Sequence, residues 1–344
     1  MQKKLIALAI AGLVSAPAFA QSNVTIYGVA DAAVGFGGHG DNDYSGIVNG
    51  VLSGTRIGFK GAEDLGNGLK AVFTLEQGFD IGNGVSLPGV GGDSTFSRQA
   101  LVGLSGSFGT VSLGRQYAPG YFFGYDAVAS APVGPQSILS VNGGMSITPN
   151  SAARWDNSVA YTGSFSGLTA RAIYSMKAVE TDPNPNDDDA YGLGLDYANG
   201  PLSVGGVYQV IQNNVEDQEE WGVGAGYDFG VVKVLGSYQA VDGIGFANGA
   251  EADLWQVGVV VPVGKAGNVH LAYGEYDRDD LNNAGAESYT LAYTHALSKR
   301  TTAYVAYNNT ENESGTNRFG VVAGTAGDLG DDSDILTVGI RHTF

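Results

Sequence analysis

The chain has 344 residues, no cysteine and a formal net charge of −18 at pH 7. Without cysteine it forms no disulfide, and a protein this acidic is a poor partner for nucleic acid, because phosphate binding depends on lysine and arginine. Its 54 glycines are about twice the usual share, yet 43% of the residues are apolar, which is too many for a disordered chain. Glycine and tyrosine in such numbers fit a large curved sheet.

Residues 1–20 have the features of a secretory signal peptide. Lys3 and Lys4 precede an apolar run over residues 5–14, and Ala18 and Ala20 form a cleavage site of small residues. The run is shorter than the roughly 18 apolar residues that a membrane-spanning helix needs. We expect cleavage after Ala20 and a single domain over residues 21–344, with no linker.

The mature chain is dominated by segments of about ten residues that alternate in polarity. Between residues 221 and 229, the odd positions carry apolar or aromatic side chains, and the even positions carry glycine or aspartate. Apolar faces with aromatic residues at their ends are typical of the outer surface of a transmembrane barrel. A soluble sandwich would show the same alternation but bury its apolar faces against each other. The export signal and the alternation of short and long connections favour the barrel.

We count about sixteen strands between Val24 and Phe344, an even number that puts both ends on the side of the short turns. The final segment, residues 336–344, alternates in polarity and ends on Phe344. Pairing with the first strand, residues 23–34, would close the barrel and leave neither strand as an exposed edge. The predicted fold is an all-β, transmembrane antiparallel barrel.

Five stretches resemble the general porins of β-proteobacteria, the Gram-negative porin family. They are residues 23–31, 53–79, 96–117, 154–168 and 338–344, among them SGTRIGFKGAEDLGNGLKAVFTLEQGF and VGIRHTF. The resemblance implies a sixteen-stranded homotrimer in the outer membrane of a Gram-negative bacterium, in contact with lipid and lipopolysaccharide. It also implies a third loop folded into the pore, and a terminal Phe344 that the barrel-assembly machinery reads.

The longest apolar connection, residues 117–150, is the candidate for that loop. It is rich in aromatic residues and carries one charged side chain, Asp126. A connection of this length in a compact domain is either functional or mobile. We expect it to narrow the pore; the alternative is a surface loop or a contact between subunits.

Three arginines are placed toward the lumen by alternation. Arg56 has the parity opposite to its apolar neighbours on the strand, and the same holds for Arg154 and Arg171. Trp155, next to Arg154, is therefore expected to face lipid. Any one of these arginines is about as often a structural ion pair or a solvated residue as a functional one.

Two further arginines are less regular. Arg115 shares the parity of Val111 and Leu113, so it faces outward unless the strand bends or has ended. Alternation does not determine which face of the sheet Arg98 takes. The resemblance implies basic residues of both motifs near the constriction, which favours Arg98.

These residues predict a water-filled diffusion channel for small hydrophilic solutes, with a mild preference for anions. Arg56, Arg98 and Arg154 would face a loop whose one acid is Asp126. Cation preference is the alternative if Glu76 and Asp156, which share lumen parity, lie level with the arginines. The predicted constriction comprises Arg56, Arg98, Arg154, Arg171, Asp126 and Glu76.

Other functions find less support. An outer-membrane hydrolase would need Ser112 or Ser158 close to His270, and an adhesin or structural anchor would fill its lumen or lack an inward loop. The four histidines have no metal-ligand spacing, and the G-x-G-x-x-G string at residues 35–40 is followed by no helix. Aspartates 187–189 are expected to be solvated, with divalent bridging to lipopolysaccharide as the alternative. We expect no enzymatic activity, cofactor or bound metal.

Overall fold

The computed structural model describes residues 23–87, 95–128, 133–151, 153–178, 189–320 and 327–344. The predicted signal peptide, residues 1–20, lies outside the described residues. The same holds for Asp187 and Asp188. Among the described residues, no helix has the length and apolar character needed to cross a membrane.

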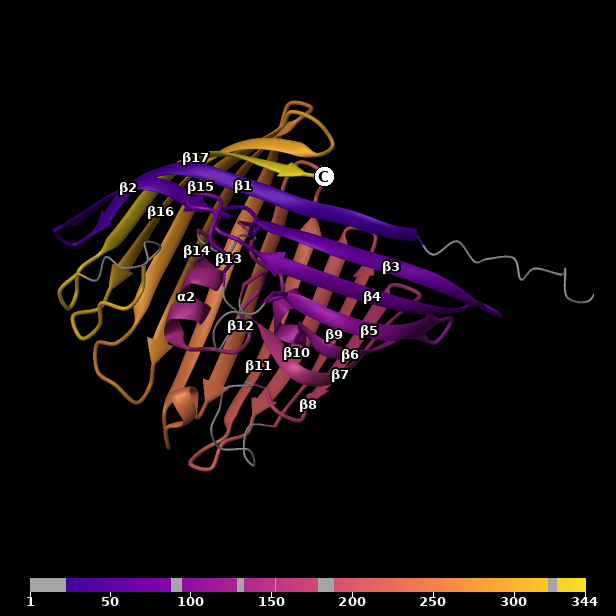
Figure 1. Ribbon diagram of the computed structural model, residues 1–344. Coiled ribbons are helices and arrows are strands. Elements are labelled where there is room, and N and C mark those ends of the chain that lie inside the picture. Colours follow the sequence, from indigo (N-terminus) through magenta and orange to yellow (C-terminus); the bar gives the residue numbers. More distant parts are fainter. Residues whose placement is uncertain (1–22, 88–94, 129–132, 152, 179–188, 321–326) are drawn as a thin grey trace, which may run out of the picture.

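The described chain is almost entirely β-structure (Figure 1). Its strands are β1 (Asn23–His39), β2 (Asn42–Asn49), β3 (Arg56–Gly66), β4 (Leu69–Gly78), β5 (Gln99–Gly106), β6 (Gly109–Tyr117), β7 (Arg154–Phe165), β8 (Leu168–Ser175), β9 (Ala190–Asn199), β10 (Leu202–Ile211), β11 (Gln218–Asp228), β12 (Lys233–Asp242), β13 (Glu251–Val263), β14 (Gly267–Arg278), β15 (Ala286–Ala296), β16 (Thr301–Asn312) and β17 (Ser333–Thr343). Three short helices join them: η1 (Pro119–Phe122), α2 (Pro135–Gly143) and η2 (Ile244–Phe246).

The strands form a closed antiparallel barrel. From β3 to β17 each strand pairs with the next one along the chain, and β17 returns to β1, where Val34 lies opposite Val338. The predicted pairing of the last strand with the first is thus confirmed. The pairing leaves neither strand as a free edge, which removes a template for aggregation.

The barrel has sixteen strand positions although the described chain contains one strand more. β2 pairs with one half of β1, from Ala32 to His39, and β3 pairs with the other half, from Asn23 to Val29. The two are parts of one strand that is interrupted at residues 50–55. The predicted count of about sixteen is confirmed, and the interruption accounts for the extra strand.

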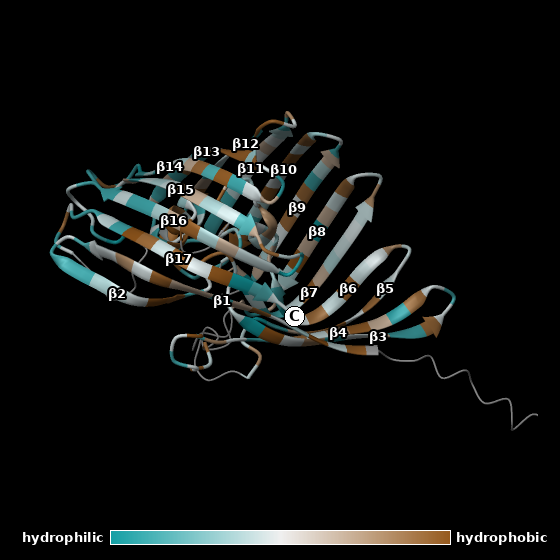
Figure 2. Ribbon diagram, turned by 90° about the horizontal axis from the view of Figure 1, so that it is seen from above, coloured by the Kyte–Doolittle hydropathy of each residue, from teal (hydrophilic) through white to brown (hydrophobic). Residues whose placement is uncertain are grey.

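Side chains alternate between an exposed apolar face and an inner face that is mostly small or polar. On β11, Val223 is 52% exposed, whereas Gln239 on β12 and Thr290 on β15 are buried on the opposite face. Figure 2 shows the resulting alternation of brown and teal along the strands. An apolar exterior on a closed barrel matches a lipid environment.

The connection between β6 and β7 packs against side chains of the far wall. The backbone N–H of Gly120 donates to Gln209 Oε1 (2.6 Å), and Gln256 Nε2 donates to the carbonyl of Tyr125 (2.6 Å). In α2, Gln136 Nε2 donates to Gln239 Oε1 (3.1 Å). These wall glutamines lie on the face opposite the exposed apolar side chains, and Figure 1 shows α2 within the curve of the sheet.

Candidate pore constriction

The carboxylate of Glu76 is the centre of a group of charged and phenolic side chains. Glu76 projects inward from β4 and is buried. Its Oε1 lies 2.7 Å from Arg98 Nε, and its Oε2 lies 3.4 Å from Arg56 Nε. The hydroxyl of Tyr27 donates to Oε2 (2.9 Å) and that of Tyr117 to Oε1 (3.2 Å). A carboxylate with four such partners holds both guanidinium groups in defined positions.

Alternation explains the position of Arg56 but not that of Arg98. Arg56 begins β3 opposite Val29, an inward residue of β1, so the predicted orientation of Arg56 is confirmed. The regular pairing of β4 with β5 ends where Glu76 lies opposite Gln99, so Arg98 lies just before β5. Because Arg98 is outside the strand, its side chain does not follow the alternation. Its Nε donates to Glu76 Oε1, and its Nη2 donates to the Tyr117 hydroxyl (2.7 Å).

Arg154 joins the same group through an aromatic ring. Its guanidinium carbon lies 4.9 Å from the centroid of Tyr117, a cation–π distance, and Tyr117 stacks on Tyr121 with centroids 3.6 Å apart. We call Arg56, Arg98, Arg154 and Glu76 the arginine cluster. Two of its guanidinium groups contact the Glu76 carboxylate, and the third lies over the ring of Tyr117, whose hydroxyl donates to Glu76.

The parity argument for Arg154 was wrong in one respect. Trp155 does not face lipid; it is 4% exposed and packs with Ala118 and Ile173. The alternation fails because Asn157 has a left-handed backbone (φ 46°) and the register between β6 and β7 shifts near residue 115. Such irregularities change which face a side chain takes.

Two predicted or possible pore arginines form ion pairs away from the arginine cluster. Arg171 projects inward from β8, as predicted, but pairs with Asp196 and lies over the Phe122 ring (4.3 Å). Arg115 pairs with Asp156 (2.6 Å) at the irregularity in β6. Asp156 therefore pairs with Arg115, whereas Glu76 is the acid that pairs with Arg56 and Arg98.

Asp126 is not brought to the arginine cluster. It is buried in the β6–β7 connection, where its carboxylate accepts hydrogen bonds from the backbone N–H groups of Val128 (2.7 Å) and Gln136 (3.1 Å). Burial raises the pKa of the Asp126 carboxyl to about 6, in spite of these hydrogen bonds. The Asp126 side chain therefore stabilises the β6–β7 connection through backbone hydrogen bonds and does not face the arginines.

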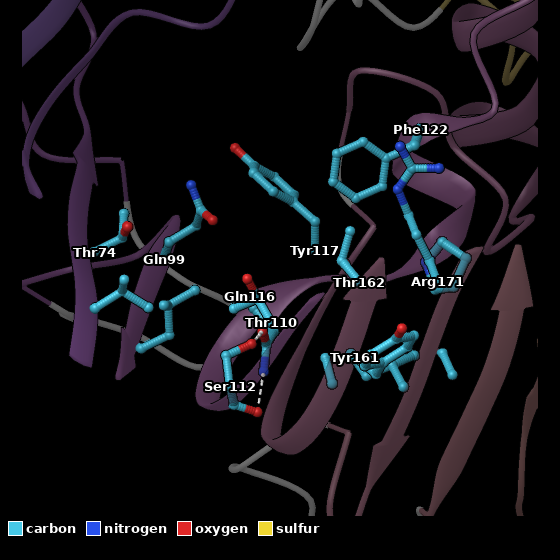
Figure 3. Close-up of a pocket in the computed structure, with 16 residues that line it drawn as sticks. Thr74, Gln99, Thr110, Ser112, Gln116, Tyr117, Phe122, Tyr161, Thr162 and Arg171 are labelled. Atoms are coloured by element: carbon cyan, nitrogen blue, oxygen red, sulfur yellow. Dashed lines mark hydrogen bonds between the residues drawn. The ribbon is translucent and has the colours of Figure 1, made fainter. Parts of the chain in front are cut away.

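A recess of about 260 Å³ is lined in part by Tyr117, the residue whose ring contacts Arg154 (Figure 3). Tyr117 and Phe122 lie on one side of it, and Arg171 contributes a cation. Its other lining is uncharged and mixes apolar side chains, such as Val72, Leu101 and Ile173, with the hydrogen-bonding side chains of Thr74, Gln99, Thr110, Ser112, Gln116 and Thr162. This lining offers donors and acceptors to water and to hydrophilic solutes.

The serines and histidine of the hydrolase alternative have other partners. Ser112 Oγ donates to Gln116 Oε1 (2.5 Å), and Ser158 Oγ donates to the carbonyl of Gly114 (2.7 Å). The ring nitrogens of His270 lie 2.9 Å from the Ala127 carbonyl and 3.0 Å from Thr294 Oγ1. Within the described ranges, no group of acidic and histidine side chains has metal-ligand geometry.

The phenolic side chains Tyr27 and Tyr117 were not among the predicted site residues. Tyr27 could have been found, because it has the inward parity of β1 and lies opposite Gly58, two residues from Arg56. Tyr117 ends β6 and gives no such signal. Phe344 pairs through its backbone with Gly28, at 3.1 Å in both directions, and its role in assembly stays a prediction.

The closed barrel with an apolar exterior and a charged interior defines an outer-membrane channel protein. A family model described as Gram-negative porin matches residues 7–315, and the chain belongs to this family. Its place is therefore the outer membrane of a Gram-negative bacterium.

Individual proteins agree with this assignment. The chain is 32% identical to an outer membrane porin protein of Bordetella pertussis and 34% identical to outer membrane porin protein 32 of Delftia acidovorans, each over 100% of both chains. Among solved structures it is similar to the anion-selective porin from Comamonas acidovorans, with a TM-score of 0.78 and 30% identity. That match covers 94% of this chain and 100% of the other.

Proposed function

We propose that this porin is a passive, water-filled channel for small hydrophilic solutes, in which the connection over residues 117–150 narrows the pore and the arginine cluster favours anions. The observation that carries the proposal is the arginine cluster itself, in which Arg56 and Arg98 share the carboxylate of Glu76 and Arg154 lies over the ring of Tyr117. An ion that sheds part of its water in a narrow section responds to the charges lining it.

The net charge of the whole chain, −18, points to cations, but most acids lie away from the arginine cluster. Asp41, Glu216 and Asp279, for example, are in connections between strands. Salt screens exposed charges beyond about 8–10 Å, whereas low-dielectric walls strengthen the field in a narrow section. The similarity to the Comamonas acidovorans protein, whose title gives anion selectivity, supports the same sign.

The proposal is tested by removing two arginines and measuring the zero-current potential across a planar bilayer in a KCl gradient. Arg56→Ser combined with Arg154→Ser should shift the potential toward cations. The matched control is Lys299→Ser with Arg300→Ser, which removes the same charge from the exposed turn between β15 and β16. An arginine-cluster variant that behaves like this control would place the selectivity elsewhere.

We propose further that the chain assembles as a homotrimer, contacts lipopolysaccharide, and is inserted by the barrel-assembly machinery with Phe344 as part of the signal. The family resemblance supports these partners, and the exposed apolar face offers surface for subunit contact. Sedimentation of the detergent-solubilised protein tests the trimer. A single monomeric species under mild detergent conditions would contradict it.

A further inference from the structure

The interruption between β2 and β3 is fastened by one side chain of β1. Asp31 points inward and is 0% exposed. Its Oδ2 accepts hydrogen bonds from the backbone N–H groups of Leu52 and Ser53, both at 2.8 Å. Its Oδ1 accepts a hydrogen bond from the hydroxyl of Tyr304 on β16 (2.6 Å). All of these are interactions with a buried carboxylate, so each is difficult to replace with water.

The backbone of Asp31 holds the two ends of the same segment. Its carbonyl accepts a hydrogen bond from Gly50 N (2.9 Å), where the chain leaves β2 with a left-handed φ of 70°. It accepts another from Thr55 Oγ1 (3.0 Å), just before β3 begins. Val51 is buried against the inner wall between them. Residues 50–55 are therefore fixed at both ends and in the middle by one residue.

This segment in turn supports the arginine cluster. Arg56 Nη1 donates to Ser53 Oγ (3.1 Å) and to the Gly54 carbonyl (2.9 Å). Gly54 also lies directly against Arg98, because a Cβ at residue 54 would be 2.9 Å from Arg98 Nη1. The two guanidinium groups that share Glu76 thus contact Ser53, whose N–H donates to Asp31, and the following residue, Gly54.

We infer that Asp31 is a positioning residue for ion selectivity, and this inference rests on the proposed function. It acts through residues 52–54, which hold the guanidinium of Arg56 beside Glu76 and pack against Arg98. Asp31 is itself an acid in the barrel wall, so its charge alone would favour cations. Its charge and its positioning role therefore predict opposite effects when the carboxylate is removed.

Asp31→Ala and Asp31→Asn separate the two effects. Asparagine can keep the geometry, because its Oδ1 can accept from both N–H groups while its Nδ2 donates to the Tyr304 oxygen. Asp31→Asn should therefore leave the zero-current potential unchanged or move it toward anions. Asp31→Ala leaves the buried N–H groups without acceptors, so the segment must rearrange and Arg56 loses its support. Its potential should move toward cations, in the direction of Arg56→Ser and by less.

Several results would overturn the inference. One is a potential for Asp31→Ala that is unchanged or moves toward anions, since only the charge would then matter. Another is an equal shift toward cations in Asp31→Asn, since the hydrogen-bond geometry would then be irrelevant. Arg56→Ser is measured in parallel. If Arg56→Ser leaves the potential unchanged, the proposed function fails, whereas a shift in Arg56→Ser without one in Asp31→Ala rejects the inference alone.

Folding is checked by heat-modifiable migration in gels before any channel is recorded. If Asp31→Ala does not fold, Thr55→Val carries the test. This change keeps the charge and approximate shape but removes the hydroxyl that bonds to the Asp31 backbone. A shift of the potential toward cations supports the inference, and an unchanged potential contradicts it.

Discussion

Replacing Glu76 by Gln removes the one carboxylate of the arginine cluster and should strengthen anion preference. By Coulomb's law, a chloride ion about 8 Å from the lost charge gains about 0.5 kcal/mol at an effective dielectric constant of about 80 and about 2 kcal/mol at about 20. Since about 1.4 kcal/mol corresponds to a factor of ten, the chloride permeability should rise by about twofold to about thirtyfold, and the potassium permeability should fall by a similar factor.

The same substitution should weaken the local structure. Glu76 is buried and bonds to Arg56, Arg98, Tyr27 and Tyr117, and removing one partner of a buried ion pair costs about 3–5 kcal/mol. The closed ladder of strands is untouched, so the barrel should still fold. The assay is the zero-current potential in a KCl gradient, with Glu219→Gln as control, because Glu219 is an exposed acid near the start of β11. No change, or a shift toward potassium, would refute the placement of Glu76 in the narrow section.

Three other perturbations test the structure. Val257 lies on the outer face and is 44% exposed, so Val257→Arg should lower the free energy of unfolding by about 2–4 kcal/mol, measured by urea unfolding from liposomes. Thr74→Arg, in the recess, should instead lower the conductance. Equal losses of stability in the two variants would reject the assigned faces. Gly28→Val should impair barrel closure, because a Cβ there would lie 2.4 Å from the Phe344 ring, and an unchanged heat-modifiable fraction would contradict this. Burial raises the pKa of Asp126 to about 6, so its protonated form stabilises the loop below about pH 4, and this contribution falls as the pH rises through 6. The Asp126 carboxyl band, identified in infrared spectra by its loss in Asp126→Asn, should titrate near pH 6. A midpoint near pH 4 would be inconsistent with burial.

The barrel was predictable because its physical signal is local. A strand with one face in lipid must alternate, and Trp221, Val223 and Tyr227 do so without interruption. The pairing of β17 with β1 followed from the need to avoid a free edge. The signal failed where the ladder is irregular, since a single left-handed residue, Asn157, made the parity of Trp155 misleading.

The site was predictable in part. Arg56 and Glu76 lie on regular strands, and alternation gave their orientation. Arg98 lies beyond the end of a strand, so only the resemblance favoured it. Asp126 looked like a pore charge because it is alone in its loop, but its environment depends on how the loop folds back on Val128 and Gln136. Asp31 contacts Tyr304, which lies 273 positions away in the sequence, so no local sequence pattern indicates this contact.

The sign of the wild-type zero-current potential is the most direct test of the central claim. Purified protein would be inserted into a planar bilayer between KCl solutions of different concentration, and single channels recorded. Stable ohmic steps are expected, with a potential of the sign set by chloride. A potential of the sign set by potassium, from channels that are open and stable, would contradict the claim that the arginine cluster governs the narrowest section.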